Sequence, residues 1–230
     1  MIPEPRLNIW EHSLSLRELC RRRALDLEPE MDCAAQGAEL LAPLVRQMAF
    51  APKLLDVGCG GGHFLHSLKR RGLEVDYYGL DSSPSLIETA QKAFAEQNLD
   101  PARLMLGDVS HLCDFSCHLA VMINVLSFNP DFRAPLERLA ETGAKALLIR
   151  DNFGEGTIIR WETDGFLDPG YNHLKGYWNQ WSRKEVGDFL RRRGYKTSFI
   201  EDARTKGGLE LVVEKPYYWS WLLAEKKAVY

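Results

Sequence analysis

Short apolar runs alternate with segments of helical periodicity along most of the chain. The first run, residues 54–57, has a proline before it and glycines after it, as expected of a strand that is buried on both faces. From His63 the apolar residues recur at helical spacing until Gly72, and the same strand–helix succession repeats as far as residue 150. This order predicts a parallel sheet with helices on both faces. We expect its further strands at 75–80, 104–106, 118–125 and 144–150.

The pattern changes after residue 150. Residues 151–181 are rich in aromatic and amide side chains, and glycines and Pro169 interrupt any long periodicity. Ser182 with Glu185 three positions later forms a capping box, which predicts a helix that ends at Gly194. Strands are then expected at 195–201 and 217–225. Residues 209–213 are either a short extra strand or part of a long hairpin connection.

The first 50 residues contain two predicted helices ahead of the first strand. Residues 1–12 are expected to form an irregular arm, and Ser13 or Ser15 can cap a helix through Leu16, Leu19 and Cys20. A second helix is expected from Asp32 to Ala49. A length of 230 residues favours one domain, so we expect a helical extension at 1–50 and the main domain at 51–230.

A glycine-rich turn follows the first strand and carries the clearest chemistry. The dinucleotide pattern G-x-G-x-x-G fails, because its third position falls on His63 or Leu65, and no Gly-Lys-Ser/Thr of a P-loop follows. The sequence instead reads acid-x-Gly-x-Gly-x-Gly from Asp56 to Gly62. It resembles the first motif of class I S-adenosylmethionine-dependent methyltransferases. The alternative is a tight structural connection between strand and helix.

The resemblance implies a Rossmann-like α/β three-layer sandwich whose seven-stranded, mostly parallel sheet has an antiparallel last strand. It implies S-adenosylmethionine as cofactor, with Asp56 near the ammonium and Asp108 at the adenine amino group. Asp81 stands where nucleoside-binding folds have the carboxylate that accepts both ribose hydroxyls, although Asp81 and Asp108 could instead be a helix cap and a turn residue. The predicted cofactor-binding residues are Asp56, Gly58, Cys59, Gly60, Gly62, Asp81, Ser82, Gly107, Asp108, Val109, Asn124 and Val125.

The segment 151–181, which we call the flap, lies over the reactive end of the cofactor in the resembled fold. We expect it to line an apolar acceptor pocket, or else to be a packing flap. A hydroxyl acceptor needs a general base, for which His173 is the first candidate and Asp151 the second. The N-terminal helices resemble the lid of many small-molecule methyltransferases, or they only cover the sheet edge. The predicted pocket residues are Asn152, Tyr171, Asn172, Tyr177 and Trp178.

Charge and the sequence around Asn124 count against nucleic acid as the methyl acceptor and favour a small organic molecule. The net charge of −3 gives no basic field for nucleic acid, and the Asn124-Val125-Leu126-Ser127 sequence lacks the Pro-Pro-aromatic continuation of amino-directed base methyltransferases. No apolar run approaches the ~18 residues of a membrane span. The five scattered cysteines suggest reduced thiols in a cytoplasm.

Other functions stay open at this point. His111, Cys113, Cys117 and His118 lack a second half of a metal site, so no metal is expected. Methylation of a protein or RNA, and a cofactor-binding partner subunit without catalysis, are the alternatives to a small-molecule enzyme. The sequence does not determine the oligomeric state.

Overall fold

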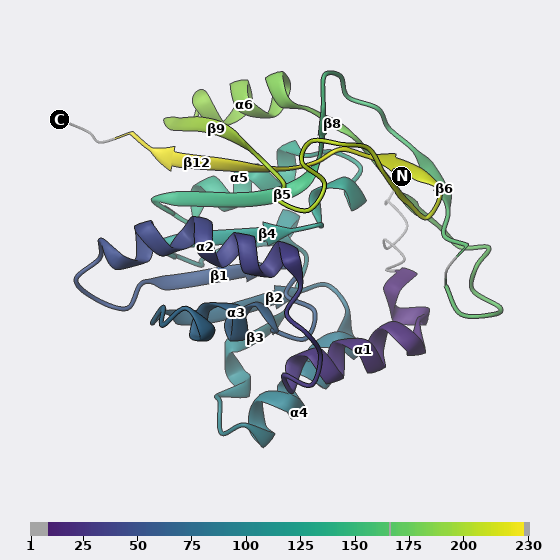
Figure 1. Cartoon of the computed structure of the whole chain (residues 1–230), viewed down its shortest axis with the longest axis horizontal. Coiled ribbons are helices and arrows are strands. Elements are labelled where there is room, and N and C mark those ends of the chain that lie inside the picture. The colour runs from purple at the N-terminus through teal and green to yellow at the C-terminus, as the bar shows by residue number, and fades with distance from the viewer. Residues whose placement is uncertain (1–8, 166, 228–230) are drawn as a thin grey trace.

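The computed structural model describes residues 9–165 and 167–227, and within them eight strands form the main sheet (Figure 1). The strand order is β3-β2-β1-β4-β5-β12-β9, and the short β8 pairs with β5. The first five of these strands run parallel, whereas β12 is antiparallel to both β5 and β9. The predicted Rossmann-like sheet with an antiparallel last strand is therefore confirmed. The strands are β1 (Lys53–Val57), β2 (Asp76–Asp81), β3 (Leu104–Leu106), β4 (Leu119–Ile123), β5 (Ala146–Gly154), β8 (Trp181–Ser182), β9 (Tyr195–Glu201) and β12 (Trp219–Lys226).

Helices cover both faces of this sheet. Successive strand residues point to opposite faces, so Leu54 packs with the helices α2, α3 and α4, whereas Leu55 packs with α5 and α6. Figure 1 shows the same two layers, with α5 and α6 on the opposite side of the sheet from α2 and α3. The α-helices are α1 (Leu14–Ala24), α2 (Asp32–Arg46), α3 (Phe64–Arg70), α4 (Pro84–Glu96), α5 (Arg133–Glu141) and α6 (Arg183–Arg191).

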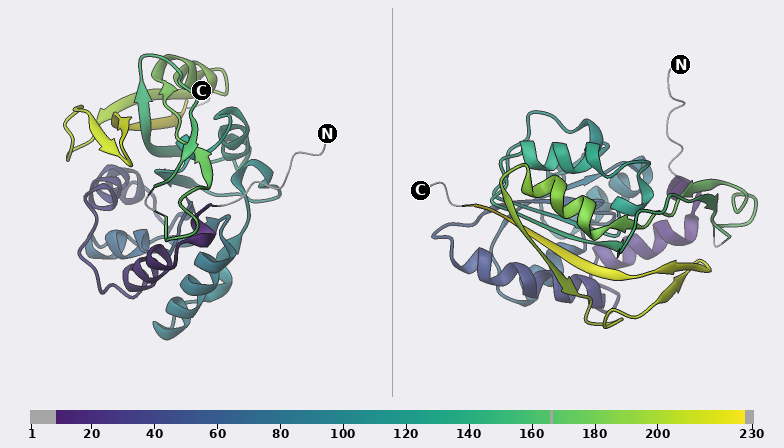
Figure 2. Two further views of the ribbon diagram at one scale, coloured as in Figure 1. Left: turned by 90° about the vertical axis from the view of Figure 1, so that its right-hand side faces the viewer. Right: turned by 90° about the horizontal axis from the view of Figure 1, so that it is seen from above.

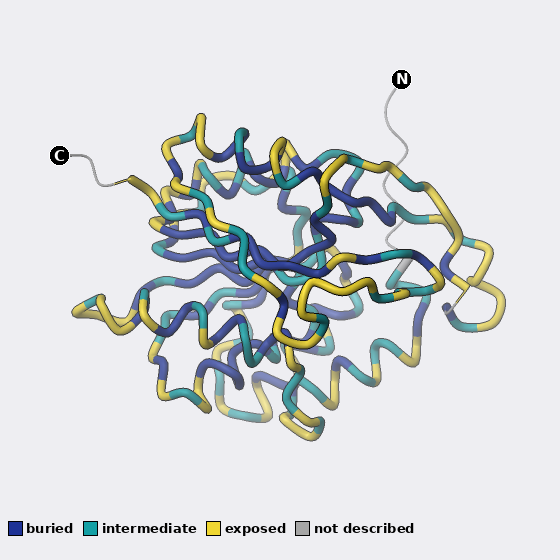
Figure 3. Tube along the Cα trace, turned by 45° about the horizontal axis from the view of Figure 1, so that its top comes forward, coloured by how far each residue is buried: buried dark blue, intermediate teal, exposed yellow. Residues whose placement is uncertain are grey.

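The central strands form the buried core. Every residue of β1 after Lys53 is buried, as are the first four residues of β4 and the first eight of β5 (Figure 3). Full burial of one leucine side chain stabilises the fold by about 1.5–3 kcal/mol relative to exposure. The near-continuous apolar runs that marked these strands in the sequence reflect this two-sided covering.

Local capping determines where the helices begin at the carboxyl edge of the sheet. The Ser83 hydroxyl accepts the Leu86 N–H at 3.2 Å and Pro84 takes the first helical position of α4. Ser182 caps α6 in the same way through the Glu185 N–H, and Ser13 caps α1. The loops that follow the strands are thereby held at one edge.

Several boundaries differ from the predicted ones. β4 ends at Ile123, because Asn124 has a φ of +58° and a 3-10 helix, η4 (Leu126–Phe128), follows at once. β5 extends four residues beyond its predicted end, into the flap. Residues 209–213 contain the expected short extra strand, β10, which pairs with β11 in a separate hairpin and not with the main sheet. The remaining short elements are η1 (Ile9–His12), η2 (Pro101–Arg103), η3 (Val109–His111), β6 (Trp161–Thr163), β7 (Lys175–Tyr177), β10 (Glu210–Val212) and β11 (Lys215–Tyr217).

The N-terminal extension divides into two parts with different neighbours. α2 belongs to the layer on the sheet, whereas α1 lies beside α4 at the carboxyl edge (Figures 1 and 2). Of the arm predicted at residues 1–12, residues 1–8 lie outside the described part and residues 9–12 form η1. No helix within the described ranges is both long and apolar enough to cross a bilayer.

Candidate functional site

The glycine turn connects β1 to α3 at the carboxyl edge of the sheet. Gly58, Gly60 and Gly62 all have positive φ values, of +71°, +51° and +72°. A Cβ on Gly58 would lie 2.1 Å from Cγ2 of Val125, so the turn and the residues after β4 are in direct contact. The turn is also joined to β2, since the Gly58 and Cys59 N–H groups donate to the Leu80 carbonyl at 2.7 and 3.1 Å.

Asp56 lies beneath this turn and is 3% exposed. Its Oδ2 accepts a hydrogen bond from the Tyr77 hydroxyl at 2.5 Å. Burial raises the pKa of Asp56 to about 7, and the nearby Asp81 carboxylate adds to the rise, while the Tyr77 hydrogen bond opposes it. A positive group brought next to Asp56 would favour its charged form.

Asp81 ends β2 and connects three strand ends. Its Oδ2 accepts the Gly60 N–H at 2.8 Å and its Oδ1 accepts the Ser83 N–H at 2.9 Å. Its carbonyl accepts the Gly107 N–H at 2.9 Å, which joins the end of β3. Burial raises the pKa of Asp81, and these backbone donors oppose the rise. Each carboxylate oxygen has a second lone pair, so Asp81 can accept two further hydrogen bonds.

Asp108 follows β3 and caps η3. Its Oδ1 accepts the Ser110 N–H at 2.7 Å, and Val109 between them is buried. The Ser110 hydroxyl is buried and finds no hydrogen-bond partner among the described residues. A buried polar group without a partner is uncommon, and it is consistent with a polar ligand beside η3.

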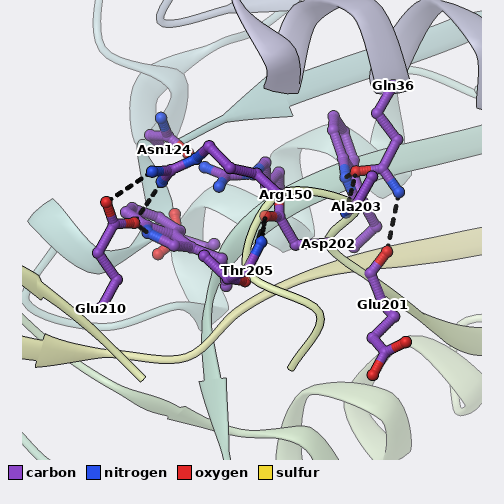
Figure 4. A network of polar contacts seen from close by, with 12 residues as sticks. Gln36, Asn124, Arg150, Glu201, Asp202, Ala203, Thr205 and Glu210 are labelled. Carbon is purple, nitrogen blue, oxygen red and sulfur yellow. Dashed lines mark hydrogen bonds and ion pairs between the residues drawn. The ribbon is translucent and has the colours of Figure 1, made fainter. Parts of the chain in front are cut away.

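Asn124, directly after β4, is held in the left-handed region by a buried network (Figure 4). The Arg150 side chain donates to Asn124 Oδ1, and its Nε donates to Asp202 Oδ2 at 2.6 Å. Arg150 and Asp202 are 2% and 1% exposed. The guanidinium also lies 4.2 Å over the Trp219 ring. A left-handed non-glycine residue is strained, and here the ion pair fixes its amide.

Gln36 joins α2 to the same region in Figure 4. Its Nε2 donates to the Glu201 carbonyl at 2.8 Å, and its Oε1 accepts the Ala203 N–H at 2.9 Å. The loop that contains Asp202 is therefore fixed from two sides.

A family model described as a methyltransferase domain matches residues 54–143. This match spans the glycine turn, Asp81, Asp108 and Asn124, which the structure brings to one edge. The match and this geometry together support a class I S-adenosylmethionine-dependent methyltransferase.

A malonyl-[acyl-carrier protein] O-methyltransferase from Paenibacillus sp. (strain JDR-2) is 34% identical over 77 residues, which is 32% of this chain and 28% of that relative. An S-adenosylmethionine-dependent methyltransferase from Clostridium acetobutylicum ATCC 824 has a TM-score of 0.60 at 13% identity, covering 86% of this chain and 93% of its own. Magnesium protoporphyrin IX methyltransferase from Synechocystis PCC 6803 with bound SAM has a TM-score of 0.59 at 17% identity, covering 95% and 94%. At these identities the structures share the fold.

The residues at the edge fit the family's cofactor, S-adenosylmethionine. That molecule combines a ribose diol, an adenine amino group and an ammonium, and all three donate hydrogen bonds. The edge offers three carboxylates as acceptors, Asp56, Asp81 and Asp108, and a turn whose glycines allow close approach of the backbone. The remaining residues predicted for the cofactor, Cys59, Ser82, Gly107 and Val109, all lie in the same loops.

The residues predicted for the methyl-acceptor pocket are distributed over the flap. Trp178 is 1% exposed and packs among other rings. Tyr171 is 43% exposed and stacks on His12, with ring centroids 4.7 Å apart. Tyr177 packs on Trp161 at 4.6 Å. These aromatic residues connect the flap to the N-terminus and to its own hairpin.

The polar residues predicted for the methyl-acceptor pocket have different surroundings. Asn152 is fully buried, with its Nδ2 donating to the Asn179 carbonyl at 3.2 Å and its Oδ1 accepting the Tyr218 N–H at 2.9 Å. Its amide therefore stabilises the loops rather than facing a ligand. Asn172 and His173 are exposed on the outer turn of the flap.

Asp151, the second base candidate, is fully buried at the end of β5. Its Oδ1 accepts the Ser127 N–H at 3.1 Å and the Asn152 N–H at 2.7 Å, whereas Oδ2 has no partner among the described residues. Burial raises the pKa of Asp151. The carboxyl group thus holds η4 in position behind Asn124.

Sequence reasoning missed the N-terminal contacts with this edge. The Ser83 hydroxyl and the Ser85 N–H both donate to Glu11 Oε1, beside Asp81. No periodicity marks η1, so nothing in the sequence indicated these contacts. The Arg150–Asp202 pair had one signal, an arginine directly after the apolar run 146–149.

Proposed function

We propose that this protein transfers the methyl group of S-adenosylmethionine to an oxygen or nitrogen atom of a small organic acceptor. The observation that carries the proposal is the junction at Asp81, where its carboxylate meets Gly60 and its backbone meets Gly107. When bound, the cofactor supplies an electrophilic methyl group on a sulfonium.

Each part of the edge has a proposed role in binding. Asp81 would accept the two ribose hydroxyls with its remaining lone pairs. Asp56 would face the ammonium, which lowers its raised pKa. Asp108, with Val109, would hold the adenine. Asn124 and Val125 would border the methyl end, with the Arg150 side chain fixing the Asn124 amide.

The chain's contribution to the reaction is alignment and exclusion of water. A reactive methyl needs the acceptor atom in line with the sulfur–carbon bond, and fixed geometry supplies much of the rate. Asp151 is assigned to holding η4 through the Ser127 N–H. His173 stays a prediction for the case of a hydroxyl acceptor.

The proposal of a small methyl acceptor rests on the contact between the flap and α1. Asp168 of the flap accepts hydrogen bonds from the Leu14 N–H at 2.5 Å and the Ser15 hydroxyl at 2.8 Å, so the flap is joined to the start of α1. An enclosure made by two chain segments favours a small molecule over a polymer.

Calorimetric titration with S-adenosylhomocysteine tests the cofactor site. Asp81→Ala should lower the affinity about 100-fold, because two hydrogen bonds to a charged group contribute ~1.5 kcal/mol each. Asp100→Ala is the matched control. Like Asp81, Asp100 accepts the N–H of the residue two positions later, here that of Ala102 at 2.9 Å. Asp100, however, lies before β3, at the opposite edge of the sheet from the site.

Two results would contradict the proposal. One is an absence of binding by the wild type. The other is an Asp100→Ala loss equal to that of Asp81→Ala. A radiolabelled methyl donor then tests the acceptor: label in small molecules supports the proposal, and label in protein or RNA fractions refutes the acceptor class.

A further inference from the structure

Three aromatic rings from separate segments meet on the acceptor side. Trp10 of η1 contacts Phe128 of η4 edge-to-face, with ring centroids 5.4 Å apart and planes at 85°. It contacts Trp178 of the flap at 6.3 Å and 67°. Phe128 and Trp178 contact each other at 5.2 Å and 81°. We call these three residues the ring cluster.

The ring cluster lies next to the proposed methyl end. Phe128 ends η4, which begins two residues after Asn124. The Asn179 N–H, next to Trp178, donates to the Ser127 carbonyl at 2.9 Å and ties the flap to η4. Two of the three rings are thus fixed to the framework that follows β4.

Trp10 is attached differently from the other two rings. It belongs to a four-residue 3-10 helix outside the two large hydrophobic cores. Its neighbours are held by a few local contacts: Glu11 by Ser83 and Ser85, and His12 by the Tyr171 ring. Such a segment can move without opening either core.

A buried polar group in the ring cluster also points to a ligand. Trp178 is 1% exposed, yet its indole N–H finds no acceptor among the described residues. Buried indole N–H groups usually have a partner. A molecule with an acceptor atom, bound beside Trp178, would supply one.

We propose that Trp10 is the gate of the acceptor site, and that the acceptor carries a planar aromatic group which takes the place of the Trp10 indole against Phe128 and Trp178. This inference rests on the proposed function, because only a methyltransferase has a methyl-acceptor site at the ring cluster. Edge-to-face contacts favour an aromatic ring over an aliphatic one, because ring edges are positive and ring faces negative. A polar substituent on that group would accept the Trp178 N–H.

The gate connects the two halves of the site through adjacent residues. Glu11 is bound at the start of α4, beside the ribose carboxylate Asp81, whereas Trp10 fills the ring cluster. Displacement of Trp10 therefore disturbs the Glu11 contact.

The experiment uses protein labelled with 5-fluorotryptophan and follows fluorine NMR spectra during titration with indole, with and without saturating S-adenosylhomocysteine. Trp10→Phe assigns the Trp10 resonance. Trp161 is the internal control, since it is 53% exposed on β6 and belongs to another ring pair. Cyclohexanol is the aliphatic probe of similar size.

We expect indole to shift the Trp10 resonance saturably while the Trp161 resonance stays unchanged, and cyclohexanol to have no such effect. Trp10→Ala should bind indole about tenfold more tightly than wild type, because a site that is open a tenth of the time loses that factor in apparent affinity. Trp161→Ala should bind it as wild type does.

An unmoved Trp10 resonance at saturating indole, an equal response to cyclohexanol, or no gain in Trp10→Ala would overturn the inference. The S-adenosylhomocysteine titration in the same samples reports on the proposed function separately. If that titration fails while indole still displaces Trp10, the methyltransferase proposal falls and the aromatic site stands.

Discussion

Replacement of Gly58 by alanine tests whether the glycine turn and the residues after β4 form one surface. The backbone at Gly58 has a φ of +71°, and the added Cβ would lie 2.1 Å from Cγ2 of Val125. Two penalties therefore combine, one from the backbone and one from the contact. Gly72→Ala separates them, since Gly72 has a φ of +62° and nothing within 4 Å of an added Cβ.

The expected free energies of unfolding follow from these two environments. Gly72→Ala should cost about 1 kcal/mol, the penalty of a left-handed conformation with a side chain. Gly58→Ala should cost about 3 kcal/mol, because overpacking adds ~1–3 kcal/mol to the same backbone penalty. Val125→Ala removes the clashing methyl group. The double variant Gly58→Ala/Val125→Ala should therefore be more stable than the sum of the single changes by about 1–2 kcal/mol.

Urea unfolding measures the four stabilities, and calorimetry with S-adenosylhomocysteine measures binding. Gly58→Ala should also lower the affinity for S-adenosylhomocysteine. Gly72→Ala, at the far end of α3, should leave that affinity unchanged. If Gly58→Ala and Gly72→Ala destabilise equally, or if the double-mutant cycle is additive, the contact between Gly58 and Val125 has no energetic importance and the reasoning is refuted.

Two further predictions concern buried carboxyl groups. Burial raises the pKa of Asp56 to about 7, so the carboxyl favours folding while protonated, and that contribution is lost as the pH rises from about 4 to 7. Pairing with an ammonium requires the ionised form. S-adenosylhomocysteine affinity should therefore rise about fivefold between pH 6 and pH 7, and a flat profile in wild type, or an unchanged one in Asp56→Asn, would contradict this role. Asp202→Asn should lower the free energy of unfolding by about 3 kcal/mol in urea, because it leaves the Arg150 guanidinium buried without its counter-charge. Asp188→Asn, which removes an exposed pair with Arg191, should change it little.

The parts of the site on regular strand–helix units could be predicted from the sequence. Asp56, Asp81 and Asp108 are far apart along the chain, but each lies in the last two residues of a short strand or just after one. The carboxyl ends of neighbouring parallel strands meet at one edge of a sheet, so the pattern alone predicts that these residues lie together. The same reasoning predicted β3 to the residue and β4 only in part, because the left-handed Asn124 depends on Arg150 from the next strand.

The acceptor side could not be predicted in this way, because tertiary contacts decide what a polar residue does there. An asparagine in a loop looks the same in sequence whether it faces a ligand or binds backbone. Asn152 turned out to bind the backbone of two loops, at Asn179 and Tyr218. His173 has the chemistry of a general base, and its exposed position on the flap was not evident from the sequence.

The N-terminal segment shows why the two halves of the site belong together. Glu11 reaches the start of α4, next to the Asp81 carboxylate, and Trp10 beside it enters the ring cluster. Adjacent residues of one short helix cannot move independently, so an acceptor that displaces Trp10 also weakens the Glu11 contact at the cofactor corner. If both proposals hold, cofactor and acceptor binding are coupled through η1. By linkage, S-adenosylhomocysteine must then change the affinity for indole by the same factor by which indole changes the affinity for S-adenosylhomocysteine. Glu11→Gln should reduce that factor.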